Sequence, residues 1–131
     1  MQTKAIGVMA ILAALAAGYV WLGHGAKHTV VDVAMPKLSA SAGKGQMTFN
    51  NTCAACHGEN GSGSANGPPL IHRIYEPSHH GDHTFRLAVQ AGVRAHHWRF
   101  GNMPPVPGMT PDQVEEIITF IREVQRHNGI N

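Results

Sequence analysis

The chain has 131 residues, which is enough for one small domain preceded by a leader. Only 14% of its residues are charged and the formal net charge is +2, so the composition argues against a nucleic-acid partner. The two cysteines lie three positions apart and cannot stabilise a fold as a disulfide, because the loop they would close is too short.

Residues 5–22 form a run without any charged residue, composed mainly of Ala, Ile, Val, Leu, Met and Gly. The run is too uniform for a helix of the domain core, which would have a polar face. Its length and its aromatic residues Tyr19 and Trp21 suit a membrane-spanning helix with an interfacial belt. The small residues at 14–17 also resemble a cleavage site, so a secretory signal peptide is the alternative.

Both interpretations of residues 1–22 place the rest of the chain on the periplasmic side of the bacterial cytoplasmic membrane, with Lys4 on the inner side. We expect an anchored protein, or a soluble periplasmic one if the segment is cleaved. Residues 23–41 show no sustained hydrophobic period and are expected to form a linker. The domain itself is then predicted to span residues 42–131.

The chemistry of the sequence is concentrated in the CAACH segment at residues 53–57. Two thiols separated by two residues lie on one helical turn and can reach the two vinyl groups of a haem, and the next histidine can ligate the iron. A redox dithiol would need a surrounding βαβ pattern, and a zinc finger would usually supply a second close ligand pair. Neither is found, so Cys53 and Cys56 are predicted to attach one haem c covalently, with His57 as an axial ligand.

The residues before this motif suit a helix that starts after Ser41 and carries Met47, Phe49 and Cys53 inward. Gly45, Phe49 and Cys53 follow one another at intervals of four, and in this spacing the chain resembles the class I cytochrome c family. The resemblance implies an all-α fold, a small domain of three or more helices around one haem. In the family the glycine lets the C-terminal helix cross closely, and the aromatic residue packs in that crossing.

Residues 58–70 are so rich in Gly, Ser and Asn that they predict a loop. In the family a Gly-Pro-x-Leu segment follows the haem motif. Its proline carbonyl accepts a hydrogen bond from the proximal histidine, which orients the ligand and strengthens it, and its leucine packs on the haem. The resemblance gives these roles to Gly67, Pro68 and Leu70, while a stiff turn is the alternative role of the two prolines.

Residues 82–92 predict a helix with Phe85, Ala88 and Val89 on its inner stripe and Gly92 at its C-terminal end. The family needs only one histidine, but six more surround this helix: His72, His79, His80, His83, His96 and His97. Imidazole clusters bind copper, zinc or nickel, so a haem protein with a second, copper-like site for metal handling or sensing is an alternative function. A solvent-facing polar surface, or hydrogen bonds to haem propionates, would also explain the histidines.

Met103 lies in the GNMPP segment, which reads as a rigid extended loop. The segment resembles the family's Met-Pro loop, which delivers the distal thioether, so the resemblance makes Met103 the second axial ligand. A histidine, Met109 or an open site are the alternatives. A soft thioether favours the ferrous state and raises the reduction potential relative to two imidazoles.

Trp98 precedes Met103 by five residues. The family often has a Trp or Tyr near this position that hydrogen-bonds a haem propionate, and packing in the core is the alternative. Arg73 and Arg99 are further candidates for pairing with propionates.

Residues 111–127 predict the closing helix, because Thr110 is a good N-cap, Pro111 fits the first helical position and Gln113 completes a capping box. Its apolar residues recur at helical spacing: Val114, Ile117, Ile118, Phe120, Ile121 and Val124. The resemblance places Phe120 against Gly45 and Phe49.

The predicted function is that of an electron carrier and not an enzyme. It passes single electrons between redox proteins, such as a quinol-oxidising complex and a terminal oxidase or reductase. A peroxidase with a labile sixth ligand is a further alternative.

Overall fold

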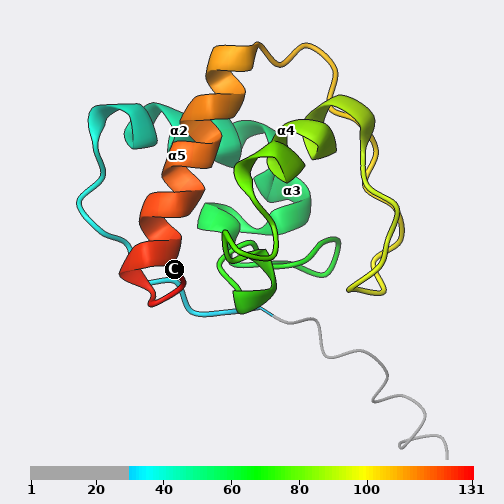
Figure 1. Ribbon diagram of the computed structural model, residues 1–131, viewed down its shortest axis with the longest axis horizontal. Helices are drawn as coiled ribbons and strands as arrows, with labels where there is room; N and C mark the ends of the chain where they lie inside the picture. The colour runs from blue at the N-terminus through cyan, green and yellow to red at the C-terminus, as the bar shows by residue number, and fades with distance from the viewer. Residues whose placement is uncertain (1–29) are drawn as a thin grey trace, which may run out of the picture.

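The computed structural model describes residues 30–131, and these residues form four α-helices, two short 3₁₀ turns and no strand (Figure 1). The elements in chain order are α2 (Ala40–Thr52), α3 (Ala54–His57), η1 (Glu59–Gly61), η2 (Arg73–Tyr75), α4 (Asp82–Ala91) and α5 (Pro111–His127). The predicted all-α fold is therefore confirmed for this part of the chain. The hydrophobic helix predicted within residues 1–22 lies outside the described residues. Within residues 30–131, no helix has the length and apolar character needed to cross a bilayer.

Residues 30–39, here called the N-terminal strap, have no regular secondary structure. They were expected to be part of a linker, but they pack against the domain. Four of their apolar side chains pack against the core, namely Val31, Val33, Met35 and Leu38. The backbone N–H of Val31 donates to the Ser62 carbonyl at 2.8 Å. The side-chain amide of Asn128 bonds both the N–H and the carbonyl of Ala34, at 3.0 and 2.8 Å. The strap therefore joins the globular part of the chain ahead of residue 42.

Helix α2 begins at Ala40, slightly earlier than predicted, because Ser39 is its N-cap. The Ser39 hydroxyl accepts a hydrogen bond from the backbone N–H of Ala42 at 3.2 Å. The inner face of the helix carries Ala42, Gly45 and Phe49, all of which are buried.

Met47 does not point inward as predicted, since 63% of its surface is exposed. A helix turns by about 100° per residue, so Met47 lies about 200° around the axis from Gly45. The same rotation places Phe49 almost directly above Gly45, at i+4. Two residues of an i, i+2 pair cannot share one narrow helix face, which is why the prediction for Met47 was wrong.

Helix α5 crosses α2 and makes the main helix–helix contact of the domain (Figure 1). Gly45 lies at the crossing, where a Cβ atom would overlap the backbone carbonyl of Glu116. Phe49 packs on Phe120 with their ring centroids 5.6 Å apart. The expected crossing, with a glycine and an aromatic pair at its centre, is confirmed, although Gly45 contacts the backbone of α5 at Glu116 and Ile117.

The bounds and the cap of α5 agree with the prediction. The Thr110 hydroxyl accepts from the backbone N–H of Gln113, and the Gln113 side chain accepts from the backbone N–H of Thr110. The six apolar residues predicted to face inward are buried: Val114, Ile117, Ile118, Phe120, Ile121 and Val124. Arg122 and Gln125 are buried with them, although polar residues were not expected on this face.

Helix α4 lies beside α5 and ends at Gly92, whose φ of 76° is the left-handed conformation that glycine adopts without strain. Phe85 packs against the core, and Ala88 and Val89 face the same cavity as Phe85. The predicted inner stripe of this helix is therefore confirmed.

Candidate haem site

The helices and loops enclose a cavity of about 700 Å³. Its walls come from α2, the CAACH segment, α4, α5 and the loops at 68–70 and 93–103. The predicted site residues that line it are Cys53, His57, Pro68, Leu70, Trp98 and Met103. Of the four residues predicted to attach or ligate the haem, Cys56 alone does not line the cavity, since it is exposed. The cavity thus brings together residues that lie up to fifty positions apart in the sequence.

His57 is held by the carbonyl of Pro68, 2.9 Å from its Nδ1. With Nδ1–H as the donor, Nε2 is left free to bind a metal, as ligating histidines usually are. Burial lowers the pKa of His57, against the opposing effect of the Pro68 bond, and this favours the neutral ligand form. The proline role implied by the resemblance is therefore present in the structure.

Gly67 lets the loop pass close to the CAACH segment. A Cβ atom at this position would lie 2.8 Å from the carbonyl oxygen of Cys56, closer than real side chains come. The next carbonyl, that of Pro68, then reaches His57. A larger residue at 67 would push this acceptor away from the imidazole.

The two thiols are not joined in a disulfide, and the environment of Cys53 does not activate its thiol. Burial, and then the neighbouring Cys56, raise the pKa of Cys53 to about 11. A redox-active dithiol needs a thiolate of low pKa, next to positive charge or a helix N-terminus. The neutral Cys53 thiol fits attachment to a buried group better than disulfide exchange.

Met103 is fixed by its backbone. It forms an antiparallel bridge with Val93, in which each residue donates its N–H to the other's carbonyl at 2.9 Å. Gly92 lies directly against the Met103 carbonyl and leaves no room for a side chain. The N–H of Val106 donates to the carbonyl of Val89 at 2.8 Å and fastens the same loop to α4. These bonds keep Met103 in the cavity wall although it belongs to no helix.

The indole Nε1–H of Trp98 is buried without a hydrogen-bond acceptor, the one such side-chain atom found in residues 30–131. A buried donor without a partner costs free energy, so a bound group with an acceptor oxygen would satisfy it. Burial raises the pKa of the neighbouring Tyr75 to about 12, and hydrogen bonding to the Trp98 side chain opposes that rise, although the geometry of this contact falls short of a full hydrogen bond. The cavity therefore fits a haem, with apolar walls, the Cys53 thiol in its lining and Cys56 one helical turn further on, an oriented imidazole, a thioether and a donor for a propionate.

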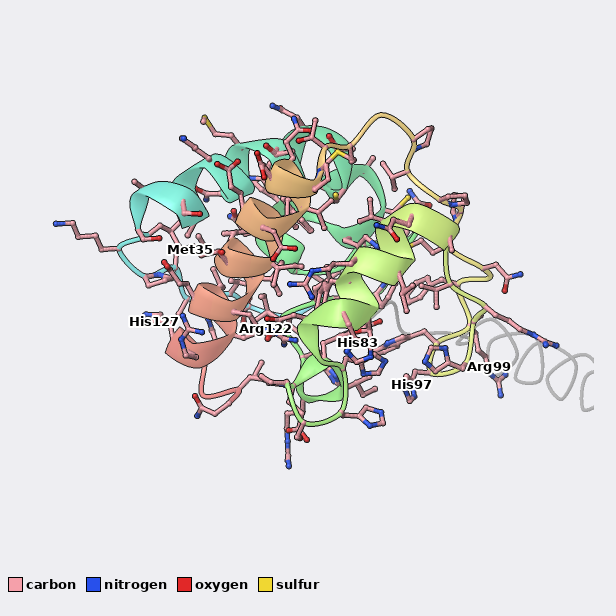
Figure 2. All side chains as sticks on the ribbon, turned by 45° about the horizontal axis from the view of Figure 1, so that its top comes forward. Met35, His83, His97, Arg99, Arg122 and His127 are labelled. Carbon is pink, nitrogen blue, oxygen red and sulfur yellow. The ribbon has the colours of Figure 1, made fainter. Side chains whose placement is uncertain are left out.

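Arg73 and Arg99 are exposed and do not line the cavity, so the structure does not bring them to the predicted propionate position. Figure 2 shows the Arg99 side chain pointing outward from its loop. Arg94 lines the cavity instead.

Four of the six additional histidines gather at the exposed edge of the cavity: His79, His80, His96 and His97. The two pairs flank α4 in the sequence and approach each other in the structure. His72 does not line the cavity but lies behind Trp98, with its ring edge-on to the indole at a centroid distance of 5.1 Å. His83 does not line the cavity.

Three residues that shape this wall were missed from the sequence, namely Tyr75, Arg122 and Gln125. Arg122 donates to Asp82 at 2.8 Å and to the carbonyls of Tyr75 and His80 at 2.7 and 2.5 Å. Gln125 is fully buried and donates to the carbonyl of Leu70 at 2.9 Å. The helical period could have indicated that Arg122 and Gln125 are buried. Each follows an apolar residue of the inner face of α5 by four positions, Ile118 and Ile121 respectively.

The family model of cytochrome c matches residues 42–125. No curated protein matches the chain. The matched range begins within α2 and ends within α5, and it contains both cysteines, His57 and Met103. The chain therefore belongs to the cytochrome c family, whose proteins carry covalently bound haem c and transfer electrons through it.

Proposed function

We propose that this protein is a mono-haem electron carrier, with haem c attached to Cys53 and Cys56 and with His57 and Met103 as the axial ligands. The observation that carries the proposal is the bond between Nδ1 of His57 and the Pro68 carbonyl, in a cavity that Met103 also lines. A bound haem would supply a one-electron iron couple. The chain's own residues would hold it, set its potential and exclude other ligands.

His57 supports this function through its fixed orientation. The Pro68 carbonyl accepts a hydrogen bond from Nδ1–H, so Nε2 presents its lone pair and the imidazole becomes a stronger ligand. Pro68 follows Gly67, whose close approach to Cys56 keeps the acceptor in place.

Met103, far downstream of His57 in the chain, supports the same function. Its bridge to Val93 places the thioether on a loop with little freedom. A soft thioether favours the ferrous state, and a filled sixth position leaves no open site for oxygen or peroxide. This favours electron carriage over the peroxidase alternative.

Leu70, Trp98 and the buried faces of α2 and α5 would surround the haem. Leu70 is 9% exposed and lines the cavity with Phe49. The unsatisfied Nε1–H of Trp98 would donate to a propionate.

We further propose that the carrier works at the periplasmic side of the cytoplasmic membrane, anchored by residues 1–22. The support is the uncharged apolar run in that segment. Its partners would be redox proteins that dock weakly and transiently at the cavity edge. Membrane fractionation of the full chain tests the anchor, since deletion of residues 1–22 should release the protein.

The ferric absorption spectrum tests the axial ligands. Thioether ligation gives a weak far-red band, and Met103→Ala should abolish it and lower the midpoint potential. Met109→Leu, which keeps the apolar contact of the rival methionine, should leave both unchanged. Survival of the band in Met103→Ala would refute Met103 as the ligand.

A mass spectrum of the denatured protein tests the attachment and the number of haems. The intact chain should carry the mass of one haem, and Cys53→Ala combined with Cys56→Ala should carry none. A second covalently bound haem, or retention in the double variant, would contradict the proposal.

A further inference from the structure

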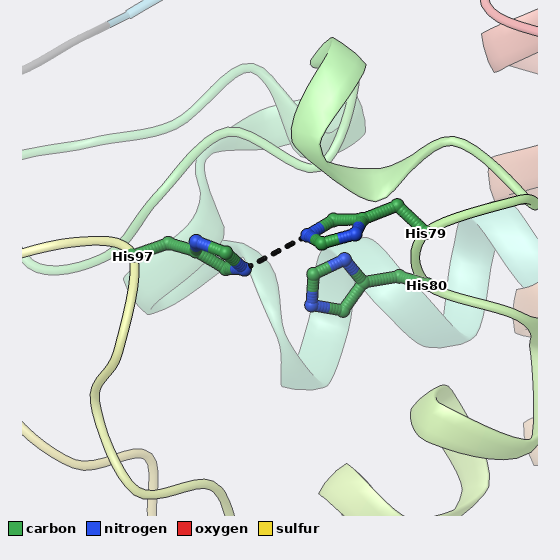
Figure 3. A group of neighbouring side chains, drawn as sticks. All are labelled: His79, His80 and His97. Carbon is green, nitrogen blue, oxygen red and sulfur yellow. Dashed lines mark hydrogen bonds between the residues drawn. The ribbon is translucent and has the colours of Figure 1, made fainter.

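Three imidazoles from two separate segments converge at the exposed edge of the cavity. His79 and His80 stand in the turn before α4, and His97 stands in the loop after it (Figure 3). One ring nitrogen from each residue lies within 4.8 Å of the other two. The chain approaches this point twice, from positions 18 residues apart.

The spacing suits a shared metal ion. Two nitrogens that bind one tetrahedral metal at about 2.0–2.1 Å lie about 3.3 Å apart. Nε2 of His79 and Nε2 of His97 are 3.2 Å apart. Figure 3 shows these two atoms facing each other with the ring of His80 beside them. Small rotations of exposed side chains would bring the third nitrogen to the same distance.

His80 is already oriented as a ligand. Its Nδ1 lies 2.6 Å from the carbonyl of Ile74 and donates its proton there, which leaves Nε2 as the free nitrogen. Metal-binding histidines usually donate their second N–H to a carbonyl or carboxylate in this way. The turn that carries the imidazole is therefore prepared for coordination.

The turn that carries His79 and His80 is also held in place by Arg122 of α5. Arg122 donates to the His80 carbonyl at 2.5 Å and to the Tyr75 carbonyl at 2.7 Å. The positive charge of this guanidinium is paired with Asp82, 2.8 Å away. Arg122 thus holds the backbone of the turn while Asp82 offsets the charge that would repel a cation.

His96 stands next to the three but is not one of them. Its ring centroid lies 4.3 Å from that of His97, and its Nδ1 donates to the carbonyl of Arg94 at 2.8 Å. It would support the ring of His97 and leave a fourth coordination position for water.

We propose that His79, His80 and His97 bind a divalent transition-metal ion, Cu²⁺ or Zn²⁺, at the edge of the haem cavity. Imidazole nitrogen suits both ions, and the general order of affinities puts copper ahead of zinc. The site is separate from the haem ligands, so the protein would hold two metal centres of different chemistry. Because two of the three ligands are exposed, the ion would exchange with the solvent.

Two other arrangements would explain the same cluster without a metal. Nε2 of His79 and Nε2 of His97 would share a proton in a direct hydrogen bond, or the imidazoles would all be occupied by haem propionates. In both cases the holoprotein would not take up a second metal ion.

The test uses the full haem-loaded protein in its ferric state, freed of adventitious metal with a chelator. Titration calorimetry with Zn²⁺ should show one saturable site, and electron paramagnetic resonance with Cu²⁺ should show coupling to imidazole nitrogens. His97→Ala and His79→Ala should each weaken binding by at least about 10-fold. His80→Asn, which keeps an N–H donor for Ile74, should do the same.

His127→Ala is the matched control, because His127 is exposed on α5 and Figure 2 shows it far from His97. It should bind Zn²⁺ like the parent protein. Met103→Ala should also keep the stoichiometry, which separates this proposal from that of the haem ligands. Absence of saturable binding, or unchanged affinity in His79→Ala and His97→Ala with an unaltered haem spectrum, would overturn the site.

Discussion

The cavity has two walls that are built by different means. One is made by the crossing of α2 and α5, where helices present apolar side chains such as Phe49, Ile117 and Ile118. The other is made by the turn before α4 and the loop after it, with Trp98, Arg94 and the histidines. The first wall is held by packing of neighbouring helix faces, and the second by single hydrogen bonds from distant residues.

The two walls differ because the haem cavity must be apolar on one side and accessible to solvent and partners on the other. A haem electron carrier requires a dry, apolar side that fixes the potential, and an accessible side through which electrons pass. Packing of helices supplies the first, because interiors tolerate little change in volume. Loops supply the second, because they can expose polar groups without opening the core.

The largest expected effect is at the helical wall. Gly45→Ala would place a methyl group on the backbone of Glu116, which cannot move aside as a side chain can. We expect a loss of about 3 kcal/mol in the free energy of unfolding, at the upper end for overpacking. Denaturant unfolding of the holoprotein measures it.

Gly43→Ala is the control within the same helix, since a Cβ there meets nothing within 4 Å. It should be neutral or stabilise by up to about 1 kcal/mol. Equal effects of the two substitutions would show that the crossing does not depend on close approach at Gly45.

The second effect tests the wall made of loops. Arg122→Met keeps most of the side-chain volume but removes the donors to Tyr75, His80 and Gln125. We expect a loss of about 2 kcal/mol, because the buried Gln125 oxygen and the part-buried His80 carbonyl would each lose a donor, while the Tyr75 carbonyl would keep only its bond from Gln125. Hydrogen exchange should rise in the turn at residues 75–81 and stay low in α2.

Arg126→Met, one turn further along α5 at an exposed position, should change stability by less than about 0.5 kcal/mol. If Arg122→Met raised exchange in α2 as much as in the turn, the two walls would be one cooperative unit.

The third substitution, at Trp98, should change the midpoint reduction potential of the haem and hardly change the free energy of unfolding. Trp98→Phe removes a buried N–H that has no acceptor among the described residues, so unfolding should change by less than about 1 kcal/mol. In the haem-loaded protein the lost donor would leave a propionate less compensated. The midpoint potential should therefore fall, as protein-film voltammetry would show, and an unchanged potential would argue for packing alone.

The smallest effect concerns pH at the start of α2. Hydrogen bonding from the Ser39 side chain and backbone lowers the pKa of Glu123, whose Oε2 lies 3.0 Å from the Ser39 N–H. A lowered folded-state pKa stabilises the protein above the ordinary carboxyl range, and this contribution is lost as pH falls through the folded-state value.

Glu123→Gln should thus be less stable than the parent at about pH 7, by under about 1 kcal/mol because the pair is solvated. The difference should shrink as the pH falls below the ordinary carboxyl range and through the lowered folded-state pKa of Glu123. A difference that grew on acidification would contradict this assignment.

The helical wall could be predicted from the sequence because its determinants are local and periodic. The cap at Thr110, the apolar stripe of α5 and the Gly45–Phe49 spacing all indicate one crossing. Met47 was misplaced because an inward direction was assigned to residues two apart, which the helical rotation does not allow.

The wall made of loops could be predicted only in part. The family resemblance supplied the Pro68 carbonyl and Met103, and the approach of the histidine pairs followed from their flanking of α4. The scaffold beneath them could not be found in this way, because Arg122 contacts residues 40 to 47 positions away. A polar residue on the apolar face of a helix, such as Arg122, indicates that it has a hydrogen-bond partner. It does not indicate which backbone carbonyls that partner will be.

The N-terminal strap gives the domain a mechanical property. The Asn128 side chain forms hydrogen bonds with both the N–H and the carbonyl of Ala34, and the Val31 N–H donates to the Ser62 carbonyl. A pull on the chain ahead of residue 30 would therefore be borne first by the bond to Ser62 and by the two bonds to Asn128, at the C-terminal end of α5. Tension in a tether would thus be divided between the loop at Ser62 and the end of α5 before it passed along the strap into α2, which leads to Cys53.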